Sequence, residues 1–162
     1  MFRLDGKTPE ELGVVLLRGH DHPILPRTDD RIVNVSGRHG GWDFGADLRV
    51  REFALPLEFV ACANRQKLQE RIRQFAAFLV QPDGSPRTMR LTFDTEPELF
   101  YNVRYSGRLP VQRLMEAGRF TLPLVAVEPW AQAVEETVVQ ATVTQSPQEI
   151  PLEVGGTVAT PA

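Results

Sequence analysis

The chain has 162 residues, which is enough for one domain with a sizeable core and an appended segment. Its 18 basic and 21 acidic residues give a net charge of −3, so it lacks the basic excess of a typical nucleic-acid-binding protein. The single Cys62 excludes an intrachain disulfide, and its apolar surroundings predict a small buried side chain. No apolar run approaches the ~20 residues of a membrane-spanning helix, and the N-terminus shows no apolar signal segment, so we expect a soluble protein made in a cytoplasm.

The first third of the chain is predicted to hold short strands separated by irregular segments. Apolar and β-branched residues predict strands at Phe2–Leu4, Gly13–Leu17 and Arg31–Val35. Between the last two, the segment Arg18–Thr28 contains two His and two Pro, which favours an irregular loop. The segment Ser36–Gly41 contains three glycines and predicts a chain reversal.

The clearest strand signal is Leu48–Val60, and it leads almost directly into a helix. Phe53, Leu55, Leu57 and Phe59 alternate on one face, whereas the opposite face is mostly polar; Pro56 indicates an edge position or a bulge. The helix is predicted over about residues 64–80, with Asn64 as its N-cap and the turn residues Pro82-Asp83-Gly84 after its end. Four residues form its apolar stripe: Leu68, Ile72, Phe75 and Leu79.

Three more strands are predicted after the helix. Alternation indicates strands at Arg87–Phe93 and Leu99–Leu109, separated by an acidic turn at Asp94–Pro97. Pro110–Met115 and Arg119–Val127 are expected to form a hairpin around Glu116-Ala117-Gly118, again with an edge proline at Pro123. The main block ends at Trp130. The later residues lack aromatic anchors, and Thr137–Thr144 could add one strand.

These elements predict a β-rich α+β fold. Twisted antiparallel sheets would form a split barrel or sandwich, and the one helix would pack its apolar stripe against them.

Chemical signatures are weak throughout the sequence. His20, Asp21, His22 and Asp30 have ligand-type side chains, but a polar loop explains them better than a metal site does. Asp94, Glu96 and Glu98 could serve as paired carboxylates of a glycoside hydrolase, yet nothing in the sequence places them in a cleft, and His39 fits a solvated turn. We therefore expect no catalytic residue, no metal and no cofactor.

The ordered motifs of residues 1–133 resemble the distal tail proteins of siphophages, the long-tailed non-contractile bacteriophages. The order and spacing of the motifs are more specific than any one of them. The matching pieces are Phe2…Leu4-Asp5-Gly6, Pro26-Arg27, Val35-Ser36-Gly37-Arg38-His39-Gly40, Phe53-Ala54-Leu55-Pro56-Leu57-Glu58-Phe59, Leu91-Thr92-Phe93-Asp94 with Glu96-Pro97…Tyr101, and Arg119-Phe120-Thr121-Leu122-Pro123-Leu124 before Glu128-Pro129-Trp130.

The resemblance implies a structural virion protein with a tail-tube-like fold. Residues 1–132 would form a ring of six subunits at the distal end of the tail, assembled in the host cytoplasm, and residues 133–162 would be a linker and the start of a galectin-like C-terminal domain. The implied partners are further copies of the chain, the tail tube protein, the tail tip or hub and tape-measure proteins, and receptor-binding or fibre proteins. DNA would only pass through the ring, and no membrane insertion is implied.

A ring subunit needs exposed contact surfaces, and four residues are candidates for them: Arg38, Trp42, Phe44 and Arg73. Two other functions stay open. One is a different tail-tube-like baseplate hub protein of a phage or gene-transfer particle. The other is a β-sandwich carbohydrate-binding module that uses the aromatic residues Trp42, Phe44 and Trp130.

Overall fold

The computed structural model describes residues 1–134 except 21, 63, 111, 115 and 116, and of residues 112–114 and 117 only the backbone. The elements, in chain order, are β1 (Phe2–Leu4), β2 (Val14–Leu16), β3 (Thr28–Asn34), β4 (Gly41–Leu48), β5 (Arg51–Phe59), α1 (Arg65–Leu79), β6 (Thr88–Phe93), β7 (Glu96–Tyr105), β8 (Gln112–Leu114), β9 (Ala117–Ala126) and β10 (Gln132–Ala133). Among the described residues, no helix has the length and apolarity needed to cross a bilayer.

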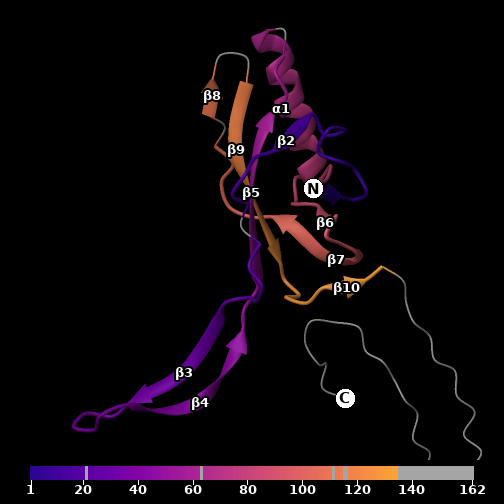
Figure 1. Ribbon diagram of the computed structural model, residues 1–162. Helices are drawn as coiled ribbons and strands as arrows, with labels where there is room; N and C mark the ends of the chain where they lie inside the picture. Colours follow the sequence, from indigo (N-terminus) through magenta and orange to yellow (C-terminus); the bar gives the residue numbers. More distant parts are fainter. Residues whose placement is uncertain (21, 63, 111, 115–116, 135–162) are drawn as a thin grey trace, which may run out of the picture.

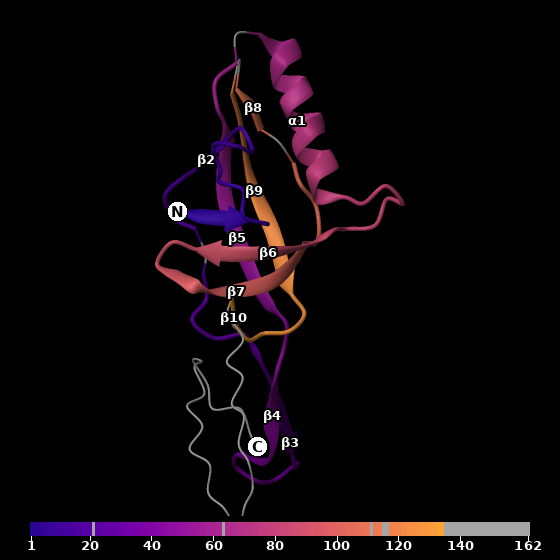
Figure 2. The same ribbon diagram turned by 90° about the vertical axis from the view of Figure 1, so that its right-hand side faces the viewer.

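Eight strands form one antiparallel sheet in the order β1-β6-β7-β9-β5-β2, with β8 added on β9 and β10 on β7. Figure 2 shows β1, β6 and β7 running across the direction of β5 and β9, so the sheet curls into a half barrel. The predicted β-rich α+β fold is confirmed. The remaining two strands, β3 and β4, form a separate two-stranded sheet that projects from this body (Figure 1).

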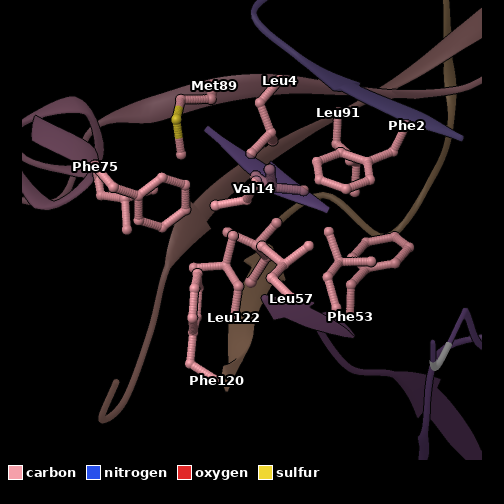
Figure 3. Packing of buried hydrophobic residues seen from close by; sticks show 14 of the residues in the cluster. Phe2, Leu4, Val14, Phe53, Leu57, Phe75, Met89, Leu91, Phe120 and Leu122 are labelled. Atoms are coloured by element: carbon pink, nitrogen blue, oxygen red, sulfur yellow. The ribbon is translucent and has the colours of Figure 1, made fainter. Parts of the chain in front are cut away.

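The core fills the concave side of the curled sheet. As the alternation predicted, Phe53, Leu55, Leu57 and Phe59 of β5 are all buried. They meet side chains from β1, β6 and β9, which Figure 3 shows converging from several strands. Each fully buried side chain of this size contributes roughly 1.5–3 kcal/mol through loss of contact with water. Cys62 is buried at the edge of the same cluster, as its sequence context predicted.

Helix α1 closes one end of this core. Its N-cap is Asn64, whose Oδ1 accepts a hydrogen bond from the Lys67 amide at 2.9 Å. Leu68, Phe75 and Leu79 are buried, and Ile72 is partly buried against the cluster. The Phe75 ring packs edge-on against Phe59 of β5, with centroids 5.7 Å apart. The helix therefore lies on the sheet through its apolar stripe.

Pro56 of β5 and Pro123 of β9 each lie where a neighbouring strand ends. The pairing of β2 with β5 stops at Leu57, and the Pro56 carbonyl accepts one further hydrogen bond from the Leu17 amide at 2.8 Å. The Pro123 carbonyl likewise accepts from the Ser106 amide at 3.2 Å, just beyond the pairing of β7 with β9. Proline is tolerated at both positions because its missing N–H faces the side on which the ladder ends.

Several strand boundaries differ from the sequence prediction, including the start of β3 at Thr28 rather than Arg31 and the end of β7 at Tyr105 rather than Leu109. The turn between β6 and β7 is shorter than predicted, because Phe93 already pairs with Glu96, so Glu96 and Glu98 lie on a strand. The predicted hairpin of β8 and β9 is present, but Ala117 and Gly118 belong to the strand. The largest difference is that the chain after the glycine-rich reversal forms β4, a strand that the sequence did not predict. The short β10 was not predicted either. The predicted strand Thr137–Thr144 lies outside the described residues.

Candidate subunit interface

Strands β3 and β4 form a ribbon, here called the arm (residues 28–48), that pairs with no other strand in the described part of the chain. Every arm residue is exposed. The glycine-rich segment predicted as a reversal connects the two strands at the tip of the arm, with Gly37 and Gly40 at positive φ. Figure 1 shows the arm leading away from the end of β5, at the opposite end of the molecule from α1.

The arm has an apolar and a polar face. Val33 pairs with Trp42, and because side chains alternate along a strand, Phe44 lies on the same side. Val35 directly follows the end of β3 and is exposed as well. These four residues are here called the apolar face. The pairs Ile32–Asp43 and Asn34–Gly41 lie on the other side, which is largely polar. Trp42 is 54% exposed and Phe44 is 65% exposed, so much of the apolar face is open to solvent.

Two glycines shape the arm. A Cβ at Gly41 would lie 2.6 Å from Cγ2 of Ile32, so only glycine allows the strands to pair this closely at the tip. Gly45 has φ +91°, at the point where the register shifts by one residue in β4. A glycine with positive φ at this position is typical of a β-bulge, which bends and twists a ribbon.

Charged pairs stabilise the arm only slightly. The Arg38 guanidinium lies over the Trp42 ring, 4.3 Å from its centroid. Arg49 pairs with Asp29 at 2.6 Å, and Arg31 pairs with Asp47. Exposed ion pairs contribute only about 0–1 kcal/mol, and an isolated two-stranded ribbon is marginally stable in water. The arm therefore gains most of its stability when its apolar face packs against another surface.

The base of the arm is held to the body by a buried arginine. Arg51 is 3% exposed; its Nη1 donates to the Tyr101 hydroxyl at 2.8 Å and its Nη2 donates to the Ile24 carbonyl. The Arg49 amide also donates to the Arg27 carbonyl at 2.8 Å. Burial raises the pKa of the Tyr101 phenol, and this outweighs the opposing effect of the Arg51 cation.

A cavity of about 440 Å³ lies beside the base of the arm. Its lining comes from two segments, Pro23–Arg27 and Arg49–Glu52, here called the arm root. Pro23, Leu25, Pro26 and Val50 supply the apolar part of the lining.

The predicted interface residues fall into two groups. Arg38, Trp42 and Phe44 come together on the arm. Arg73 is exposed on α1, at the other end of the molecule, and has no ion pair within the described residues. The structure therefore offers two separate contact surfaces.

Asp21 lies outside the described residues, and the described residues that were considered for chemistry do not come together as a catalytic group. His20 and His22 both stack on Phe93, and no set of three or more His, Cys, Asp or Glu in the described residues is arranged to hold a metal. Asp94 lies 3.7 Å from the N-terminal amine and 3.8 Å from Arg3, whereas Glu96 and Glu98 are exposed on β7. His39 is exposed at the tip of the arm.

The three aromatic residues considered for carbohydrate binding do not share one surface. Trp42 and Phe44 lie on the arm, while Trp130 lies between β9 and β10 on the main sheet. Stacking of a sugar on all three is therefore not supported.

Sequence reasoning missed β4, the apolar valines of the arm and the role of Arg51. Two signals were present. Trp42 and Phe44 alternate with Asp43, as in a strand, and Arg51 has the same phase as the buried Phe53, Leu55 and Leu57.

The model of the phage tail protein RIFT-related domain family matches residues 8–126, which include the arm and most of the curled sheet. The chain belongs to this family. The resemblance to siphophage tail proteins is thereby confirmed at the level of the family. Comparison with curated protein sequences found no match.

The fold is similar to that of a solved phage protein. The crystal structure of the Dit (gp 19.1) protein of phage SPP1, described as a paradigm of the hub adsorption apparatus in phages that infect Gram-positive bacteria, matches with a TM-score of 0.68 and 17% identity. The match covers 82% of this chain and 52% of the SPP1 protein, so the chain spans about half the length of that relative. The likeness identifies the fold.

Proposed function

We propose that the protein is a distal tail protein that forms a ring of six subunits, which joins the tail tube to the tail tip. The ring would leave a channel through which DNA passes at ejection. The proposal combines membership of the phage tail protein family with the fold of the SPP1 Dit protein, which is described as part of a hub.

The observation that carries the proposal is the exposed arm. A free ribbon with Val33, Val35, Trp42 and Phe44 on one face is suited to contact between subunits, because aromatic side chains are enriched at the centres of interfaces. Cyclic symmetry then repeats one contact around a closed ring. The net charge of −3 suits a channel that must release DNA.

The domain arrangement is part of the same proposal. Residues 1–132 would form the ring, and residues 133–162 would lead into a galectin-like domain. The partners would be the tail tube, tail tip or hub, and tape-measure proteins, with receptor-binding or fibre proteins outside the ring. The location would be the distal end of the virion tail, and no catalytic activity is proposed.

The proposal is tested by the assembly state of the purified chain. Sedimentation and negative-stain microscopy over a range of concentrations should detect a ring, alone or after addition of tails that lack this protein. Replacing both Trp42 and Phe44 with alanine should reduce assembly and leave the unfolding midpoint unchanged, because both side chains are exposed. A chain that stays monomeric under all these conditions and never joins tails would refute the proposal.

A further inference from the structure

We propose that the apolar face of the arm in one subunit docks into the arm-root cavity of the next subunit. This inference rests on the proposed ring and names the two surfaces that meet in it. The occupant of the cavity is therefore a second copy of this chain.

The arm root is a preformed receptor. Arg51 holds one wall through the Ile24 carbonyl, and the hydrogen bond from the Arg49 amide to the Arg27 carbonyl holds the other side of the opening. The volume of about 440 Å³ falls in the range of ligand pockets, roughly 300–1,000 Å³. A preformed site has less conformational freedom to lose when it binds.

The arm of the same chain cannot fill this cavity. Trp42 lies seven residues before Arg49, so about 23 Å of extended chain, at ~3.3 Å per residue, separates it from the arm root of its own chain. That length approaches the diameter of a small domain, roughly 30 Å. A neighbour displaced by one domain diameter therefore brings its arm root to the tip of this arm.

The two surfaces also match in chemistry. The apolar face presents an indole and a phenyl ring, and Leu25 and Val50 in the cavity are exposed hydrophobic residues. Arg38 stacks on Trp42 and has no ion pair in the described chain, while Glu52 in the cavity lining has none either. Docking Trp42 would bring this cation and this carboxylate to the same contact, where opposite charges favour one register.

The contact would be heterologous, because arm and arm root are different surfaces. Repetition of a heterologous contact gives a ring when the rotation closes. Each subunit would give one arm and receive one arm.

The first test places a charge in the cavity. Leu25→Glu and Val50→Glu should each raise the concentration needed for assembly by at least about tenfold, the change expected when an interface residue worth more than ~1 kcal/mol is lost. Val15→Glu is the matched control, because Val15 is 47% exposed on β2, outside the arm and arm root, whereas Val50 is 39% exposed. Unchanged unfolding midpoints would show that the variants fold.

The second test mixes two defective chains. Chain one carries Trp42→Ala and Phe44→Ala and keeps its arm root; chain two carries Val50→Glu and keeps its arm. The inference predicts that neither assembles alone at the concentration at which the wild type does, and that an equimolar mixture stops at a heterodimer, which has one intact contact. The inference would be overturned if the mixture formed no heterodimers. It would also be overturned if Leu25→Glu and Val50→Glu formed rings at the wild-type concentration. In the latter case the ring itself, and thus the proposed function, would stand.

Discussion

Arg51 and Tyr101 are joined by a buried hydrogen bond of 2.8 Å that ties β5 to β7 beside the arm root. The Arg51 guanidinium also lies 5.0 Å from the centroid of the Tyr101 ring, and its Nε has no hydrogen-bond partner in the described residues. No carboxylate within the described chain forms an ion pair with Arg51. The Tyr101 oxygen is therefore one of two acceptors that satisfy a buried cation.

Removal of that oxygen should destabilise the fold. Tyr101→Phe keeps the ring and leaves Nη1 of Arg51 without its acceptor, so we expect a loss of about 1–3 kcal/mol in the free energy of unfolding. Urea denaturation followed by fluorescence measures it. Tyr105→Phe is the control, because the Tyr105 hydroxyl bonds to the Gly107 carbonyl in an exposed position. Equal losses in the two variants would contradict a special role for Tyr101.

The ionisation of the Tyr101 phenol should also affect the stability of the protein at alkaline pH. Burial raises the pKa of the Tyr101 phenol above its usual value of about 10. Above pH ~10 the unfolded chain loses this proton while the folded chain retains it, so the unfolded state binds fewer protons and stability falls as pH rises. The stabilisation is present in full below pH ~10. Denaturation midpoints between pH 8 and pH 11 should fall less steeply for Tyr101→Phe than for the wild type; parallel profiles would contradict the assignment.

The N-cap of α1 should contribute measurably to stability. Asn64→Ala removes the side-chain acceptor of the Lys67 amide, and loss of such a cap costs about 0.5–2 kcal/mol. Asn64→Asp is the matched control, since it keeps an oxygen at the same position and adds a negative charge near the helix N-terminus. We expect thermal unfolding to show a lower midpoint for Asn64→Ala only. A comparable drop in Asn64→Asp would mean that the amide group acts in some other way.

The sequence predicted the parts of the fold that burial determines. Strand β5 could be predicted from the alternation of Phe53, Leu55, Leu57 and Phe59, because one face of β5 meets the core and the other does not. The helix could be predicted for a similar reason, since its apolar stripe and its Asn64 cap are local signals. Where one face is buried, the period of the hydrophobic residues specifies the element.

The arm could not be predicted in the same way. Strand β4 contains Gly41, Asp43 and Gly45, residue types that are depleted in strands, and it is exposed on both faces. The formation of β4 as a strand depends on its pairing with β3, and the burial of its apolar face depends on another molecule. Arg51 was missed because a charged side chain on the core phase of a strand is uncommon, and the groups that satisfy it, Tyr101 and the Ile24 carbonyl, are distant in sequence.

Loss of the central helix contact should affect folding. Phe75 packs on Phe59 and, at 5.3 Å between centroids, on Phe120. Phe75→Ala should therefore reduce the free energy of unfolding by about 3–5 kcal/mol through lost burial and a residual cavity. Chemical denaturation measures the loss. Gln74→Ala, an exposed neighbour on the same helix, should change stability by less than about 0.5 kcal/mol.

Charge reversal on the exposed side of the same helix should affect assembly instead. Arg73 is exposed and has no ion pair within the described chain, so Arg73→Glu should cost only about 0.2–0.5 kcal/mol of stability, the repulsion expected from Glu70 one turn earlier. If Arg73 faces an adjoining subunit, the same change should weaken ring formation by clearly more than this amount, and sedimentation of the variant over a concentration series measures it. Arg73→Gln separates loss of the cation from repulsion. Equal effects of Arg73→Glu and Phe75→Ala on folding would contradict this division of the helix into a packing face and a contact face.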